Sequence, residues 1–100
     1  MTVEPARVVL VEDNDIFRET LELILEPRAE LNVVGSAANG RQAVDLCARL
    51  QPDVVLVDYR MPGMNGAETT RAVLTASPRT KVICLTASTR TSVLGFLSSS

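Results

Sequence analysis

Short apolar runs alternate with stretches in which apolar residues recur every three or four positions. The apolar runs predict strands at residues 7–11, 31–37, 54–57 and 81–86. Helices are predicted from Asn14 or Asp15 to about Glu26, from Asn39-Gly40 onward, and from about Gly66 to Ala76, the third with a weak apolar stripe. Ser88 or Thr89 can cap a fourth helix carrying apolar residues at 93, 94, 96 and 97.

Four alternations of strand and helix predict an α/β fold whose parallel sheet is joined by right-handed crossovers. One hundred residues make a single domain, 1–100, and 46% apolar residues suffice for a core. The expected architecture is a flavodoxin-like, doubly wound sheet in the order 2-1-3-4. In that order a ligand crevice forms where the strand order reverses, between the first and third strands.

Acidic residues stand at the ends of those two strands. Asp58 closes the apolar run 54–57 and opens a loop rich in Pro and Gly, while Glu12 and Asp13 follow the run 8–11. The chain contains no His, so these carboxylates offer only oxygen ligands, which suit Mg²⁺. Once a metal neutralises such a cluster, a carboxylate can attack a phosphoryl group. Thr86, ending the fourth strand, could donate its hydroxyl to a phosphoryl oxygen.

Composition narrows the remaining classes of function. A net charge of −2 with no basic patch argues against direct contact with nucleic acid. No basic and apolar leader opens the chain, and no apolar run approaches the roughly 18 residues of a membrane span. Cys47 and Cys84 are interpreted as small buried hydrophobic residues. A reduced, soluble, cytoplasmic protein is therefore expected.

Three sequence blocks resemble one known family when they are taken together with their spacing. They are VVLVEDN at 8–14, VVLVDYRMPGMNG at 54–66 and VICLTA at 82–87. The chain resembles the receiver domain of bacterial two-component response regulators over nearly all of its length. The loop and fourth strand are most similar to the LuxR/NarL-type subfamily, in which a DNA-binding helix-turn-helix module usually follows.

The resemblance implies a role for each site residue. Asp58 would be the phosphoacceptor, and Asp13 and Asp58 would bind Mg²⁺ directly together with the backbone carbonyl of Arg60. Glu12 would act mainly through metal-bound water, and Thr86 would be the switch hydroxyl. The phosphoryl group would come from a phosphohistidine of a sensor histidine kinase. Such a domain assists its own phosphorylation and dephosphorylation and is not otherwise an enzyme.

The chain departs from the family after its fourth helix. The family's fifth strand, with a phosphate-pairing Lys, and its last helix would follow Ser100, so we expect a receiver domain incomplete at its C-terminus. Lys81, the single Lys, begins the fourth strand at the far end from the acids. The fourth strand would then be a poorly protected edge that favours self-association. The face shared with the first helix would expose apolar side chains of the first, third and fourth strands.

Three other functions remain open. A receiver-like fragment that only binds partners is the main alternative, because the phosphate-pairing Lys is absent. A phosphatase of the haloacid-dehalogenase type uses an Asp nucleophile but needs a second Asp where this chain has Arg60. A nucleotide-binding α/β domain needs a Gly-rich loop after the first strand, where Glu12, Asp13 and Asn14 stand instead.

Overall fold

The computed structural model describes residues 4–58 and 66–85 of the chain, without the side chains of residues 58, 66 and 85. Its strands are β1 (Ala6–Val11), β2 (Leu31–Ala37), β3 (Val54–Asp58) and β4 (Lys81–Leu85). Its helices are α1 (Asp15–Leu25), α2 (Gly40–Leu50) and α3 (Gly66–Ala76). The predicted elements are thus confirmed to within a residue or two. Thr86 and the predicted fourth helix lie outside the described residues.

Asparagine side chains start two of the helices. Asn14 Oδ1 accepts from the Phe17 N–H at 2.9 Å, and Asn39 Oδ1 accepts from the Gln42 N–H at 2.9 Å. Each asparagine satisfies a backbone donor that the first helical turn leaves open.

The helices in the described part of the chain are too short and too polar to span a bilayer.

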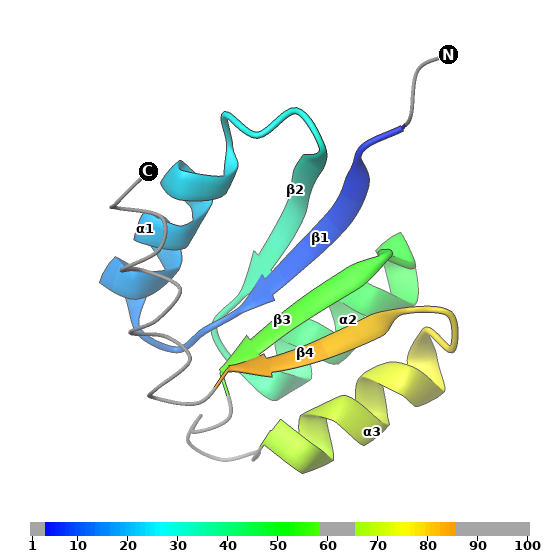
Figure 1. Ribbon diagram of the computed structural model, residues 1–100. Helices are drawn as coiled ribbons and strands as arrows, with labels where there is room; N and C mark the ends of the chain where they lie inside the picture. The colour runs from blue at the N-terminus through cyan, green and yellow to red at the C-terminus, as the bar shows by residue number, and fades with distance from the viewer. Residues whose placement is uncertain (1–3, 59–65, 86–100) are drawn as a thin grey trace.

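The four strands form one parallel sheet in the order β2-β1-β3-β4, as predicted (Figure 1). The pairing of β1 with β2 slips by one residue after Val8, which leaves Val34 as a bulge on the β2 edge. The pairing of β3 with β4 is regular throughout. All strands point the same way, so their carboxyl ends, where the acids were expected, share one edge of the sheet.

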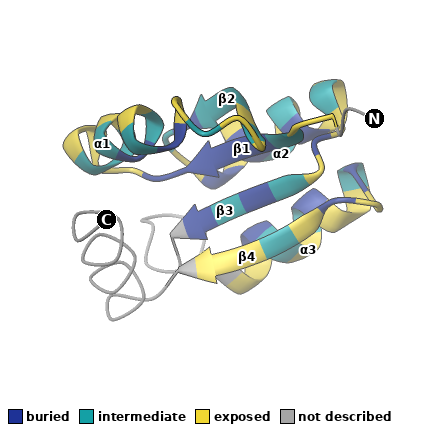
Figure 2. Cartoon of the chain, turned by 45° about the horizontal axis from the view of Figure 1, so that its top comes forward, coloured by how far each residue is buried: buried dark blue, intermediate teal, exposed yellow. Residues whose placement is uncertain are grey.

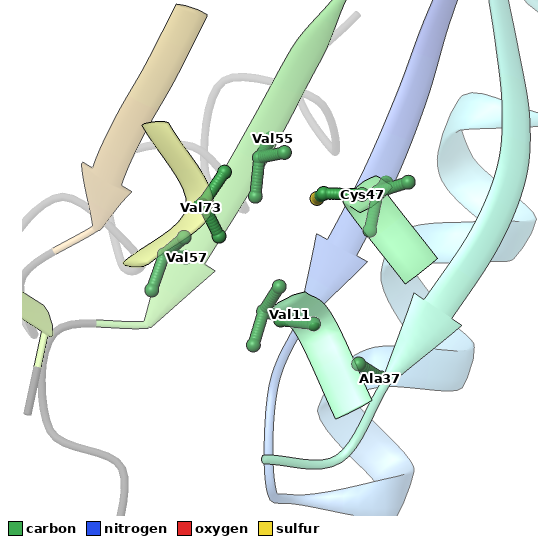
Figure 3. Packing of buried hydrophobic residues seen from close by; sticks show 8 residues of the cluster. Val11, Ala37, Cys47, Val55, Val57 and Val73 are labelled. Carbon is green, nitrogen blue, oxygen red and sulfur yellow. The ribbon is translucent and has the colours of Figure 1, made fainter. Parts of the chain in front are cut away.

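Each face of the sheet has its own apolar cluster. Helices α2 and α3 cover one face, where the buried residues are Val9, Val11, Ala37, Ala43, Cys47, Val55, Val57 and Val73 (Figure 3). Helix α1 covers the other face and buries Val8, Leu10, Leu21 and Leu25. β1 is buried on both sides, whereas β4 is largely exposed (Figure 2).

Two sequence predictions about burial are wrong. Cys84 is exposed, because β4 lies at one end of the described sheet and α3 covers only part of it. The α1 face does not expose β1: Val8 and Leu10 are fully buried, since α1 packs directly over that strand. The expected exposure is confirmed for β4, where Ile83 is 48% exposed.

Candidate acidic site at the carboxyl edge of the sheet

The two acidic strand ends lie side by side. Val11 of β1 pairs with Val57 of β3, and the next residues are Glu12 and Asp58. Neighbouring strands are about 4.8 Å apart, so the backbones of Glu12 and Asp58 are adjacent at this edge. Asp58 in turn pairs with Leu85 at the end of β4. The register therefore brings together the strand ends that the sequence marked separately.

Glu12 is 1% exposed and makes three hydrogen bonds to described residues, two through its backbone and one through its carboxylate. Its N–H donates to the Ala37 carbonyl at 3.0 Å, which extends the β1–β2 ladder by one residue. Its carbonyl accepts from Arg18 Nη1 at 2.8 Å, and its Oε2 accepts from the Asn14 N–H at 2.9 Å. A carboxylate is rarely buried so deeply unless its oxygens are bonded. Both its backbone and its side chain are therefore well fixed.

Asp13 differs from Glu12 in being exposed to solvent. It stands in the loop between β1 and α1, directly before the Asn14 cap. The structure thus separates the two neighbouring acids into one buried and one open carboxylate. An open carboxylate can ligate a metal directly, whereas the buried Glu12 carboxylate is held by the backbone of the loop.

Arg18 belongs to this site and was missed by the sequence reasoning. Its Nη1 reaches the Glu12 carbonyl at 2.8 Å, and its Nη2 lies 2.6 Å from Asp15 Oδ1. The guanidinium thus spans the loop from its first residue to the start of α1. The i, i+3 spacing of Asp15 and Arg18 was a signal for the ion pair. Nothing in the sequence indicated the bond to Glu12.

The other predicted site residues fall outside the described part of the chain. They are the side chain of Asp58, Arg60 and Thr86. Among the side chains described, residues 4–57, 67–84, no three His, Cys, Asp or Glu gather as a metal site. Lys81 is exposed and pairs with Val54 at the opposite end of β3, about 13 Å of strand away from Asp58. This confirms its predicted distance from the acids.

A hollow of about 460 Å³ lies elsewhere, along the outer edge of β2. Glu22 of α1 and Glu26, the residue after that helix, border it together with β2, and no described residue of β1 or β3 lines it. It is therefore separate from the acidic edge.

Comparison with known proteins agrees with this geometry. The sequence model of the response regulator receiver domain matches residues 8–96, which include every strand end described above. The chain belongs to the response regulator receiver family. Its sheet order and helices are those of the flavodoxin-like receiver fold.

Individual relatives include transcription regulators. The chain is 42% identical over 84 residues to the probable transcriptional regulatory protein NarL of Mycobacterium tuberculosis and 41% identical over 80 residues to the transcriptional regulatory protein LnrK of Bacillus subtilis. It covers 39% and 36% of those two proteins. The structure of the NarL signal receiver domain from M. tuberculosis superposes with a TM-score of 0.78 at 41% identity, covering 85% of this chain and 68% of that one.

Proposed function

We propose that this receiver domain accepts a phosphoryl group on Asp58 from the phosphohistidine of a sensor histidine kinase. The observation that supports this most is the register of β1 with β3. It sets Asp58 next to Glu12, and Asp13 is the residue after Glu12. Carboxylates on adjacent strand ends form an oxygen-rich site where charge can be concentrated. The reaction takes place on the protein's own carboxylate, so the domain is a phosphoacceptor rather than an enzyme with an external substrate.

The donor set fits Mg²⁺. The chain has no His, and its buried thiol, Cys47, lies in the core between the sheet and α2, so the acids at the strand ends offer oxygen ligands. Asp13 and Asp58, with the carbonyl of Arg60, would hold the ion, and Glu12 would hold it through water. When bound, Mg²⁺ offsets the negative charge of the carboxylates and of the incoming phosphoryl oxygens.

The transfer itself is a displacement at phosphorus. A carboxylate oxygen of Asp58 forms a bond to phosphorus as the phosphorus–nitrogen bond of the kinase phosphohistidine breaks. The histidine nitrogen leaves with the electron pair, and an acyl phosphate remains on Asp58. Thr86, by the family resemblance, would then turn its hydroxyl toward the new phosphoryl oxygens. We place this exchange in the cytoplasm, where thiols such as Cys84 stay reduced.

Phosphorylation of Asp58 is tested with the 100-residue chain, Mg²⁺ and a small phosphodonor such as acetyl phosphate. One phosphoryl group should be added, detected by intact mass and released by hydroxylamine. Asp58→Asn should abolish the label, whereas Asp45→Asn, an exposed acid on α2, should keep it. Labelling that persists in Asp58→Asn would overturn the assignment. We expect slow labelling, because the only Lys lies at the opposite end of the sheet.

The metal site is tested separately by calorimetric titration with Mg²⁺. Asp13→Asn removes one anionic ligand and should weaken binding sharply, while Asp45→Asn should leave it unchanged. Equal affinities for Asp13→Asn and the parent chain would remove Asp13 from the site.

Self-association is a second candidate property, favoured by β4. Ile83 is 48% exposed on a strand with neither proline nor bulge, whereas the opposite edge strand, β2, carries the Val34 bulge. Bulges and prolines are among the features that keep edge strands from pairing with other chains. If the domain binds no Mg²⁺ and takes no phosphoryl group, partner binding through such a surface is the function that remains.

A further inference from the structure

Arg18 makes hydrogen bonds to three residues where the chain passes from β1 to α1. Its side chain is 17% exposed and spans from the carbonyl of Glu12, at 2.8 Å, to the carboxylate of Asp15, at 2.6 Å. Its own N–H donates to the Asn14 carbonyl at 2.9 Å. The guanidinium and its backbone therefore contact residues on both sides of Asp13.

The ion pair alone does not explain this arrangement. The Asp15 side chain is 76% exposed, and ion pairs exposed to solvent contribute little to stability. The bond to Glu12 differs, because the carbonyl belongs to a fully buried residue at the end of β1. A planar guanidinium can hold both acceptors at fixed angles, which a Lys ammonium cannot do. The bond fixes the direction in which the chain leaves β1, and with it the starting position of Asp13.

We propose that Arg18 is a positioning residue for the metal site. It would hold the loop from Glu12 to Asp15 so that Glu12 and Asp13 are both kept at that site. The proposal rests on the proposed function, since it assumes that Mg²⁺ binds at this edge. Groups that orient metal ligands typically contribute 10–100-fold to metal affinity. We expect about a tenfold loss of Mg²⁺ affinity when the two-pronged contact is removed.

The charge of Arg18 acts in the opposite direction. A cation beside the site repels Mg²⁺, so removing it should strengthen metal binding if charge were its main effect. Arg18→Met removes both the charge and the contacts, and Arg18→Lys keeps the charge but loses the planar fork. Positioning predicts weaker binding in both variants, whereas a charge effect predicts tighter binding in Arg18→Met and little change in Arg18→Lys.

Mg²⁺ is titrated into the parent chain, Arg18→Met, Arg18→Lys and the control Arg71→Met, an exposed arginine on α3. Binding is followed by calorimetry and by the fluorescence of Tyr59, the only Tyr in a chain without Trp and the residue after Asp58. Amide hydrogen exchange of Asn14 in metal-free protein is a second readout. Its N–H donates to Glu12 Oε2, and its exchange should be about tenfold faster in both Arg18 variants.

The outcomes separate the two proposals. No Mg²⁺ binding by the parent chain overturns the metal site, and the role of Arg18 with it. Parent-like affinity in Arg18→Lys, or tighter binding in Arg18→Met, overturns the positioning role alone. If both variants fail to fold by circular dichroism, Arg18 is a folding residue and the positioning role is again overturned. Weakened binding in both folded variants, with Arg71→Met unchanged, supports the proposal.

Discussion

Thr69 places its hydroxyl in the interior of the domain. It lies in α3, one turn before Val73, and both side chains are 0% exposed. Its Oγ1 has no hydrogen-bond partner within the described part of the chain. An unsatisfied buried hydroxyl costs about 1–3 kcal/mol, because the water it bonded in the unfolded chain is not replaced.

Replacing Thr69 with Val should therefore stabilise the domain. Valine has nearly the same shape as threonine and a similar helix propensity. The substitution therefore exchanges the buried Thr69 hydroxyl for a methyl group without opening a cavity. We expect the free energy of unfolding to rise by about 1 kcal/mol and the melting temperature by about 4–8 °C for a domain of this size. Urea and thermal unfolding followed by far-UV circular dichroism measure both quantities.

Thr80→Val is the matched control, because Thr80 is also buried, at 4% exposed. Its Oγ1 donates to the Pro52 carbonyl at 2.7 Å and is hydrogen-bonded to Ser77 Oγ. The same substitution here should lower the free energy of unfolding by about 1–3 kcal/mol, since the buried Pro52 carbonyl loses this donor and Ser77 Oγ loses one of its two partners, keeping Gln51 Oε1. If Thr69→Val is neutral or destabilising while Thr80→Val behaves as expected, the Thr69 hydroxyl has a partner and the reasoning is refuted.

Further predictions concern a helix cap, a thiol and the exposed strand. Asn39→Ala should cost about 1 kcal/mol in urea unfolding, because the Gln42 N–H loses its acceptor; an unchanged midpoint contradicts the cap. Burial raises the pKa of the Cys47 thiol above its ordinary 9.0, so the unfolded chain releases this proton first and stability should fall as pH rises past about 9. Cys47→Ala should lack that component of the pH dependence, and an identical slope contradicts it. Self-association should be seen by light scattering at several concentrations and be reduced by Ile83→Lys; a concentration-independent monomer that melts cooperatively refutes it.

The local elements of this fold were readable from the chain. Continuous apolar runs such as 54–57 predict strands, and Asn14 and Asn39 mark helix starts because their side chains replace a missing backbone acceptor. The alternation of the elements then restricts the sheet to a few topologies. Asp58, Glu12 and Asp13 were identified for the same local reason, since each follows an apolar strand.

Other features depend on contacts between distant segments, and local patterns do not encode those. Cys84 sits in an apolar run, yet it is exposed because what covers a strand depends on the neighbouring elements. Gln51 adopts a left-handed conformation, with φ of 46°, at the end of α2, and its amide donates to the Ala76 carbonyl of α3 at 2.9 Å. That contact spans 25 positions and could not be seen from the turn residues alone.

The acidic site combines both kinds of information. Residue types along the chain determined which carboxylates end the strands. The pairing of Val11 with Val57 decided that they meet, because strands 46 positions apart become neighbours only through the sheet. The tertiary structure also decided that Glu12 is buried while Asp13 is open, and that Arg18 reaches back from α1 to the end of β1. A guanidinium bonded to a backbone carbonyl leaves no pattern in the sequence, since every residue offers the same carbonyl group.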